Sequence, residues 1–269
     1  MEPSPPSEPS FLRAPERVSG AVRFWLIALF VVSLGLRLWY ASPGLDSGRS
    51  YDERFGFRNL TGLLRDGTLR PRHAYYPSLA HLPQAALLAT SEGLHRATGV
   101  AAFGIHADTV DGWSPTAYLL VRILAALFGA LSLLTTYAIG RRLFSPGVGL
   151  LAAAILAAFP RHLMSSAQFK PDTLVVLLTT VTFLWTLDAV EKPTLRRFLR
   201  VGLGVGLTVS AKYTGVAAAV PIVIAVFYET WRQGRRALPL WGRLVAAGAA
   251  SMAVFVALNP YLGEVLKFG

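Results

Sequence analysis

The sequence predicts an all-α, polytopic membrane protein of about seven transmembrane helices, because of its apolar content, its long apolar runs and the placement of its basic residues. The chain has 269 residues, of which 53% are apolar and 15% charged, and its mean hydropathy is +0.47. These values exclude disorder and disfavour a water-soluble globule. The net charge of +11 would suit a nucleic-acid partner on a soluble domain. Here the basic residues stand between apolar runs, so no nucleic acid is expected.

Seven runs approach the roughly 20 apolar residues that a helix needs to cross the hydrocarbon core. They are residues 22–41, 117–139, about 148–164, 173–190, 198–211, 214–229 and 243–258. The fifth and sixth runs are short and meet at Lys212 and Tyr213, which predicts two tilted or broken spans. The chain has no cysteine, which excludes disulfides and thiolate metal sites.

The orientation follows from the basic residues, because Lys and Arg concentrate on cytoplasmic loops. With the N-terminus inside, half of the 26 Lys and Arg residues lie in the cytoplasmic tail and loops. They are Arg13, Arg17, Arg23, Arg141, Arg142, Lys192, Arg196, Arg197, Arg200, Arg232, Arg235, Arg236 and Arg243. If Leu79–Leu94 were a further span, every later loop would invert. That stretch is therefore expected to be an interfacial helix within one long external loop, residues 42–116.

The N-terminal part divides into a tail and an anchor. Residues 1–21 are rich in proline and are expected to form a disordered cytoplasmic tail. The first span is too long for a signal-peptide core, and Arg37, Trp39 and Tyr40 are expected to hold its outer end at the membrane interface. Residues 22–269 then form one transmembrane domain.

The external loop begins with two adjacent carboxylates, Asp52 and Glu53. Neighbours in sequence cannot share one helix face, so one can point into a cavity while the other caps or pairs. Phe57, Leu60 and Leu64 follow at the spacing of a short amphipathic helix on the bilayer surface. An acidic pair that is merely favoured by the helix dipole explains Asp52 and Glu53 equally well.

Five other residues belong to the same side of the membrane. Asp172 precedes the fourth span, where an N-cap role would suffice, and Lys170 stands just before it. Arg122 lies one turn into the second span, and such a residue marks a functional site or snorkels to the headgroups. Lys212 and Tyr213 form a further external pair.

Two other patterns carry little chemistry. Gly202, Gly204 and Gly206 resemble a phosphate-binding loop, but they lie inside a span with no strand before them, which favours close helix packing. No metal site is assigned, since the histidines of the long loop lack ligand spacing; they are His73, His81, His95 and His106.

Several short motifs stand in a specific order. They are Asp52-Glu53 after the first span, Tyr75-Tyr76-Pro77 before the interfacial helix, Val121-Arg122 and Gly140-Arg141-Arg142-Leu143-Phe144 in the second span, Lys170-Pro171-Asp172, Ser210-Ala211-Lys212-Tyr213-Thr214-Gly215, and Asn259-Pro260-Tyr261. In this order they resemble the polytopic glycosyltransferases of the GT-C type, in particular the protein mannosyltransferase and aminoarabinose transferase branch. The resemblance covers nearly everything after residue 20.

The resemblance implies a membrane glycosyltransferase that moves a hexose or pentose from a polyprenyl-phosphate donor to a hydroxyl of a protein, lipid or glycan. Transfer would occur on the external face of a bacterial plasma membrane. Family members usually continue with further spans and often a soluble external domain. This chain is therefore expected to be the N-terminal portion of such a protein, incomplete at its C-terminus.

The resemblance also implies roles for individual residues. Asp52 would accept the proton of the acceptor hydroxyl, and Glu53 would orient the acceptor or, in some members, a divalent cation. Asp172 would position the donor or acceptor. Positive charge for the donor phosphate and further substrate contacts would come from Lys170, Arg122, Lys212, Tyr213 and Tyr76.

Two other functions stay open from the sequence. A transporter or lipid flippase also places ionisable residues in a helical bundle, although no internal repeat is seen and the candidate charges gather at one membrane face. A non-catalytic membrane fragment is the third possibility. Convergence of Asp52, Glu53 and Asp172 on one outward-facing site would favour the enzyme.

Overall fold

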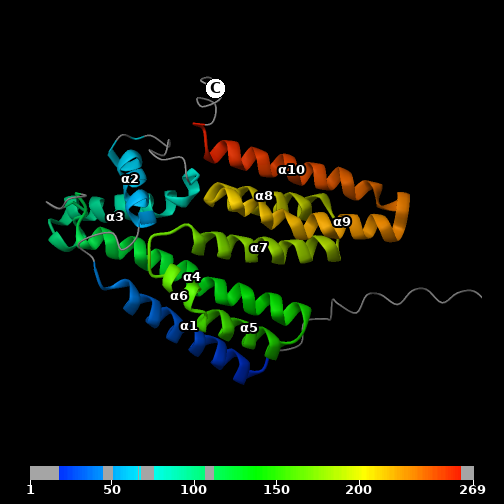
Figure 1. Cartoon of the computed structure of the whole chain (residues 1–269), viewed down its shortest axis with the longest axis horizontal. Coiled ribbons are helices and arrows are strands. Elements are labelled where there is room, and N and C mark those ends of the chain that lie inside the picture. Colours follow the sequence, from blue (N-terminus) through cyan, green and yellow to red (C-terminus); the bar gives the residue numbers. More distant parts are fainter. Residues whose placement is uncertain (1–17, 45–50, 66, 68–75, 107–111, 262–269) are drawn as a thin grey trace, which may run out of the picture.

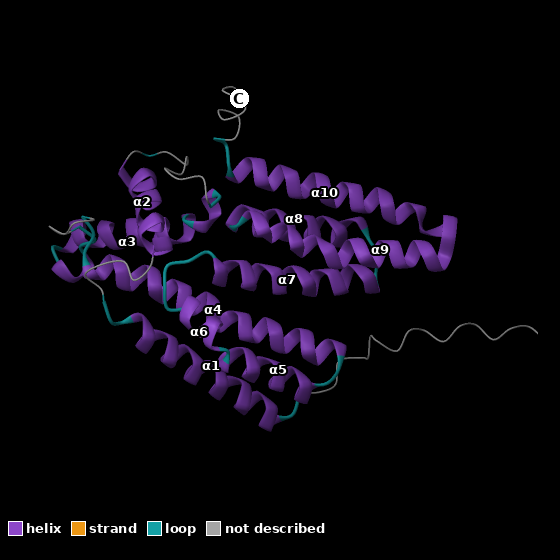
Figure 2. Cartoon of the chain, in the orientation of Figure 1, coloured by secondary structure: helices purple, strands orange, loops and turns teal. Residues whose placement is uncertain are grey.

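A computed structural model describes residues 18–44, 51–65, 67, 76–106 and 112–261. Within these residues the chain is helical and has no strand; one isolated bridge joins His106 and Trp113. The all-α prediction is therefore confirmed (Figure 2). The proline-rich tail up to residue 17 lies outside the described residues, as do residues 45–50 of the external loop. His73 and Tyr75 lie outside them as well.

The described helical elements follow one another in a fixed order along the chain. They are α1 (Gly20–Ala41), α2 (Tyr51–Arg65), η1 (Ser78–Ala80), α3 (Leu82–Thr98), η2 (Ala101–Phe103), α4 (Pro115–Leu143), α5 (Pro146–Ala158), α6 (Pro160–Ser165), α7 (Asp172–Glu191), α8 (Leu195–Ala211), η3 (Tyr213–Ala219), α9 (Val220–Gln233), η4 (Gly234–Ala237) and α10 (Leu238–Leu258).

Local sequence explains several of these helix starts. Ser19, Ser114 and Ser145 each precede a helix and accept a hydrogen bond from the backbone N–H three residues later, at 3.2–3.3 Å. Each serine thus satisfies one of the unpaired amides at a helix N-terminus. Proline occupies the first position of α4, α5 and α6, where its missing N–H costs nothing. Pro160 also breaks the third apolar run into α5 and α6.

The long helices lie side by side in one layer. Helix α10 packs on α8, α8 on α7 and α7 on α4, while α1 and α5 pack on the far side of α4 (Figure 1). Helices α2 and α3 sit at one end of this layer, on the left of the view. The turn between α9 and α10 lies at the opposite end.

Four segments of the described chain are long and apolar enough to cross a membrane: Gly20–Ala41, Pro115–Leu143, Asp172–Glu191 and Tyr213–Leu258. The last contains α9 and α10, which run back along each other and are joined by η4 (Figure 1). Helices α5 and α8 have 13 and 17 residues. The protein is an integral membrane protein, and the number of seven spans stays a prediction.

Glycines set the spacing between α8 and its two neighbours. A Cβ on Gly202 would overlap the carbonyl oxygen of Ala247 in α10, and one on Gly206 would lie 2.7 Å from the carbonyl oxygen of Ser251. A Cβ on Gly204 would instead overlap the Thr182 hydroxyl in α7. The prediction of close helix packing by this glycine motif is confirmed.

We expect Gly202→Ala to destabilise the folded protein, because the new methyl group meets backbone that cannot move aside. Overpacking of this kind costs about 1–3 kcal/mol. Thermal unfolding in detergent, followed by intrinsic fluorescence, measures the effect. Gly248→Ala in α10 is the matched control, since no atom lies within 4 Å of its Cβ position. Equal midpoints for the two variants would contradict the packing argument.

One expectation about the first span needs correction. Arg37 does not reach the interface as an anchor, because its side chain is fully buried. Its guanidinium donates to the Ser33 carbonyl at 3.0 Å and lies 3.1 Å from His162 Nδ1. His162 Nε2 in turn lies 3.0 Å from the Ser132 hydroxyl. This arginine therefore joins α1 to α6 and, through His162, to α4, while Trp39 and Tyr40 remain exposed.

Helix α2 differs from the predicted surface helix in what its apolar face contacts. Phe57 and Leu60 are buried in a protein core with Trp113, Tyr118 and Phe169 rather than turned to lipid. The Phe57 and Tyr118 ring centroids are 4.3 Å apart. Amphipathic spacing fits a protein core as well as a bilayer surface, and here neighbouring segments of the chain supply the core.

Candidate functional site

A group of charged and aromatic side chains lies where the starts of α2 and α7 meet the end of α8. We call it the Asp52 cluster; it comprises Asp52, Tyr76, Lys170, Asp172 and Lys212. The five residues come from four separate segments of the chain, and all were candidates from the sequence. The fold therefore brings together residues that no local pattern linked.

Asp52 stands in the first turn of α2 and keeps its carboxylate partly accessible. Its Oδ2 lies 3.5 Å from Lys170 Nζ, and its Oδ1 accepts a hydrogen bond from the Tyr76 hydroxyl at 3.5 Å. The side chain is 42% exposed. Both contacts are long, so the carboxylate retains lone pairs for a further donor.

Asp172 pairs with a lysine instead of capping its helix. Pro171 occupies the N-cap position of α7, and Asp172 is the first helical residue. Its Oδ1 accepts a hydrogen bond from Lys212 Nζ at 2.9 Å. The same ammonium lies 5.7 Å from the centre of the Tyr76 ring, within cation–π range. Lys212 thus connects Asp172 to Tyr76.

The Tyr76 phenol is held in its protonated form. Burial first, and then the charges of Asp52 and Asp172 and the hydrogen bond to Asp52, raise its pKa to about 12. Each cause disfavours the phenolate because it would lose hydration or lie near another anion. Tyr76 is therefore a hydrogen-bond donor throughout the physiological pH range.

Glu53 points away from the Asp52 cluster into a buried ion pair with Arg122 of α4. Arg122 Nε donates to Oε1 at 2.8 Å, and Nη2 donates to Oε2 at 3.0 Å. Both side chains are fully buried. The backbone N–H of Phe169 donates to Glu53 Oε1 at 3.1 Å. One carboxylate of the pair thus faces outward and the other is paired inside.

The remaining donors of Arg122 bind the chain just after α1. Nη1 donates to the carbonyls of Ala41 and Pro43 at 3.1 and 2.9 Å, and Nη2 donates to the carbonyl of Gly44 at 2.9 Å. With the two bonds to Glu53, these contacts use all five guanidinium N–H groups. Arg122 neither snorkels to the headgroups nor has a donor left for a phosphate, so this geometry does not fit the expected phosphate contact.

The Glu53–Arg122 pair fixes the elements that carry the Asp52 cluster. Glu53 is next to Asp52 on α2, and Phe169 is next to Lys170 before α7. A Cβ on Gly56 would lie 2.5 Å from the Phe169 ring, so glycine lets this ring pack directly on α2. The pair and the ring contact together set the distance between Asp52 and Lys170.

Tyr213 lies beside the cluster and has a different neighbour. It follows Lys212, is 40% exposed, and its ring centroid is 6.4 Å from that of Phe255 in α10. Phe255 also lines an apolar groove between α8, η3, α9 and α10 of about 420 Å³. Tyr213 therefore marks the boundary between the charged end of the layer and this groove.

Asn259 holds the site together, although it was expected only as part of the short motif Asn259-Pro260-Tyr261. Its fully buried side chain accepts a hydrogen bond from the Ser78 backbone N–H at 2.9 Å. Its amide nitrogen donates to the Phe255 carbonyl at 2.7 Å and, at 3.5 Å, to the Ser210 hydroxyl. Asn259 thus ties the segment after Tyr76 to the end of α8. Its place in that motif and at the end of an apolar run were the signals in the sequence.

His81 is a buried residue that packs against Phe169, next to Lys170 of the Asp52 cluster. It is 2% exposed, its Nε2 lies 3.0 Å from Asn59 Nδ2, and its ring contacts Phe169 edge-on. Burial lowers its pKa to about 4. The folded protein therefore keeps His81 neutral at a pH where the unfolded chain would protonate it.

This shift predicts a loss of stability in acid. Because the pKa of His81 is lower in the folded state, its contribution is full above pH 6.5 and decreases as the pH falls toward 4. One proton per molecule gives a slope of about 1.4 kcal/mol per pH unit, or about 2 kcal/mol between pH 6.5 and 5. Unfolding midpoints are measured across this pH range. In His81→Gln the midpoint should depend less on pH than in the wild type. His95→Gln, on the exposed part of α3, should keep the wild-type slope; a steep slope in His81→Gln would contradict the assignment.

No three His, Asp or Glu side chains of the described residues lie close enough together to hold a metal ion. A divalent cation at the Asp52 cluster would have Asp52 and Asp172 as its nearest carboxylates, and both already pair with lysines.

Comparisons with known proteins give the family. Residues 117–259, more than half of the 269 residues, match the family model of the dolichyl-phosphate-mannose-protein mannosyltransferases. The chain belongs to this family. The matched region begins in α4, ends at Asn259 and includes three members of the Asp52 cluster, which are Lys170, Asp172 and Lys212.

The chain has the same fold as a solved structure. The protein O-mannosyltransferase Pmt1-Pmt2 complex of S. cerevisiae, bound to the sugar donor, superposes with a TM-score of 0.66 at 18% identity. The match covers 94% of this chain and 34% of the yeast chain. A comparison with curated proteins gave no match. The fold is that of a GT-C protein mannosyltransferase, as the resemblance implied.

Proposed function

We propose that the protein transfers a sugar from a polyprenyl-phosphate donor to an acceptor hydroxyl at the external face of the membrane. The convergence of Asp52, Lys170, Asp172 and Lys212 at one end of the helix layer carries this proposal. A donor that is confined to the bilayer presents its phosphate at headgroup level. The end of the helices is therefore where a base and cations are needed.

Asp52 is the proposed general base. The acceptor oxygen forms a bond to the anomeric carbon while the bond from that carbon to the phosphate oxygen breaks. The hydroxyl proton passes to Asp52, and the polyprenyl phosphate leaves with the electron pair. Its 42% exposure leaves room for an acceptor within hydrogen-bond reach. Lys170, whose Nζ lies 3.5 Å from Oδ2, orients the carboxylate.

Lys212 is the proposed contact for the leaving phosphate. Cations placed where negative charge develops lower the barrier more than they strengthen substrate binding. Asp172 orients the Lys212 ammonium, and Tyr76 offers a neutral donor beside it. Tyr213, which adjoins the apolar groove, would contact the donor where its phosphate meets its lipid chain.

The groove of about 420 Å³ fits the lipid part of such a donor. Its lining is almost wholly apolar and includes Val209, Val216 and Phe255. Val209 and Val216 flank Lys212 in sequence, so the groove approaches the proposed phosphate position. A polyprenyl chain would bury apolar surface there without displacing a protein segment.

Glu53 and Arg122 are proposed to support the site rather than to touch substrate. Their burial and mutual pairing leave neither group free for an acceptor or a phosphate. We further propose that residues 22–269 form one transmembrane domain with its N-terminus inside, in a bacterial plasma membrane. The arginines around η4 at the far end of the layer support this orientation.

A transfer assay tests the function. Membranes containing the protein receive polyprenyl-phosphate mannose labelled in the sugar, and label is measured in protein, lipid and glycan fractions. We expect covalent label in one of these acceptor fractions and release of unlabelled polyprenyl phosphate. Movement of intact donor across vesicle membranes without sugar transfer would overturn the proposal in favour of a transporter.

A lysine substitution tests the proposed phosphate contact. Lys212→Gln should lower the turnover number about 10²-fold, since loss of a preorganised donor to a developing charge typically costs this much. Lys192→Gln is the matched control, because Lys192 is an exposed lysine at the opposite end of the layer. Equal turnover in the two variants would contradict the role of Lys212.

A further inference from the structure

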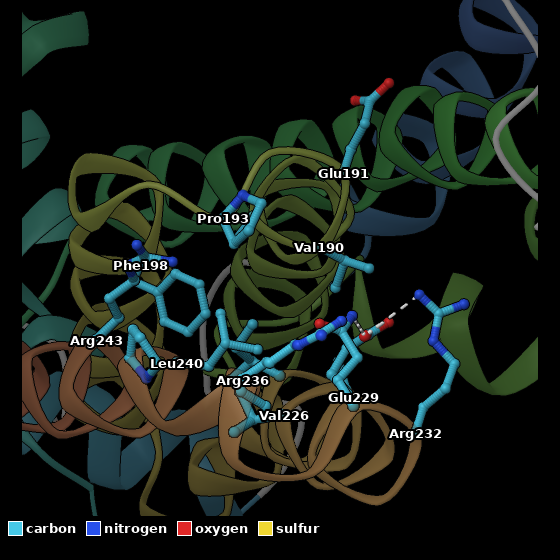
Figure 3. A pocket seen from close by; sticks show the side chains of 16 residues that line it. Val190, Glu191, Pro193, Phe198, Val226, Glu229, Arg232, Arg236, Leu240 and Arg243 are labelled. Carbon is cyan, nitrogen blue, oxygen red and sulfur yellow. Dashed lines mark hydrogen bonds and ion pairs between the residues drawn. The ribbon is translucent and has the colours of Figure 1, made fainter. Parts of the chain in front are cut away.

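A second hollow lies at the end of the layer opposite the Asp52 cluster. It has a volume of about 720 Å³ and is enclosed by the ends of α7 and α9, the starts of α8 and α10, and η4. Figure 3 shows its lining side chains, with Arg243 beside Phe198 and Leu240 at one side and the Glu229–Arg232 pair at the other. This hollow takes no part in the proposed transfer reaction.

The hollow carries positive charge that the protein itself does not neutralise. Its two carboxylates are engaged: Glu191 accepts from Arg142 Nη2 at 2.8 Å, and Glu229 pairs with Arg232 at 3.5 Å. Arg236 and Arg243 also line it. Neither has a carboxylate within 4.0 Å among the residues that the structure describes, so both guanidinium groups are available to an external anion.

The rest of the lining is apolar. Val190, Phe198, Ile222, Val226 and Leu240 form its wall, and Phe198 belongs to the buried core of this end of the layer. A site for a free phosphate or a nucleotide phosphate would need the cations alone. Cations at the rim together with an apolar wall match a molecule that has both an anionic group and a hydrocarbon part.

Aromatic residues place this hollow at the level of the membrane interface. Trp231 is 83% exposed next to Arg232, and Trp241 in α10 donates from its indole N–H to the Thr230 hydroxyl at 2.9 Å. Tryptophan concentrates where hydrocarbon meets headgroups. The arginines of the hollow therefore lie at the depth of lipid phosphates.

We propose that this hollow binds one phospholipid with an anionic headgroup. Arg236 and Arg243 contact the phosphate and headgroup, and one acyl chain lies against Val190, Ile222 and Leu240. Basic pockets between transmembrane helices are suited to anionic lipid headgroups. The bound lipid would join α7 and α8 to the α9–α10 turn.

Native mass spectrometry of the purified protein in detergent tests this site. Phosphatidylglycerol, phosphatidylcholine and inorganic phosphate are added in separate arms, and bound copies are counted against concentration. We expect one tight phosphatidylglycerol, weaker phosphatidylcholine and no retained phosphate. Arg236→Gln combined with Arg243→Gln should weaken phosphatidylglycerol binding about 25-fold, since each arginine near a lipid surface contributes about a factor of five.

Two controls separate a built site from general attraction to basic surface. Arg196→Gln combined with Arg235→Gln removes the same charge from exposed positions that do not line the hollow, and it should leave the tight phosphatidylglycerol in place. Val190→Trp keeps every charge but fills part of the hollow where the acyl chain would lie, and it should therefore displace the lipid. Equal losses in the two double variants, retention of phosphate as tight as that of the lipid, or no effect of Val190→Trp would each overturn the proposal.

Discussion

Arg122→Met should lower the free energy of unfolding by about 3–5 kcal/mol, the usual effect of breaking a buried ion pair. The substitution leaves the Glu53 carboxylate fully buried without the guanidinium that neutralises it. It also frees the carbonyls of Ala41, Pro43 and Gly44. Unfolding in detergent, followed by fluorescence against increasing sodium dodecyl sulfate, measures this loss.

Two comparisons make the result specific. Arg96→Met breaks a pair with Glu92 in which the arginine side chain is 75% exposed, and it should barely move the unfolding midpoint. Glu53→Gln combined with Arg122→Met removes the stranded charge, so the double variant should be more stable than Arg122→Met alone. An Arg122→Met variant as stable as Arg96→Met would contradict the structural role of the pair.

Asp52→Asn should abolish sugar transfer while leaving the fold and membrane insertion intact. Asparagine preserves the shape and the contact with Tyr76 but cannot accept the acceptor proton. Loss of a general base lowers turnover about 10²–10⁴-fold. The transfer assay with labelled polyprenyl-phosphate mannose measures the rate, and retention of the labelled donor on the purified protein measures binding, which we expect to persist.

The matched control is Glu92→Gln, a carboxylate-to-amide change on α3 outside the Asp52 cluster. It should transfer sugar at the wild-type rate. Asp52→Glu should recover part of the activity, since the base returns with a longer side chain. Full activity of Asp52→Asn would overturn the assignment of Asp52, and loss of donor retention in that variant would reassign it to binding.

The fold could be predicted because a membrane protein records its architecture in local sequence. Apolar runs act within a few residues, and α1, α4, α7 and α10 all contain such a run. Serine caps also act locally, and they mark the starts of α1, α4 and α5. The family resemblance used motifs of two to six residues, and the family match confirms it. The exact number of spans depends on how short helices such as α5 sit in lipid, which apolar length alone does not decide.

The internal partners of the site could not be predicted in the same way. Glu53 and Arg122 are 69 residues apart, and adjacency to Asp52 did not reveal which carboxylate would turn inward. Arg37 has the sequence pattern of an interface anchor, yet its buried side chain contacts His162, which is 125 residues away. Hydrophobic periodicity predicts which face of a helix is apolar, but not whether lipid or protein covers that face.

The hydrogen bond from Ser78 to Asn259 has a consequence for the order in which the protein assembles during synthesis. The two residues are 181 positions apart, so a ribosome that adds about 5–20 residues per second needs about 10–40 s to pass from one to the other. During that interval the segment after Tyr76 lacks the amide that will hold it. All residues of the Asp52 cluster are therefore synthesised before Asn259 is available to bind Ser78. The end of the layer that carries the Asp52 cluster therefore reaches its described form only after α10 and Asn259 have been made.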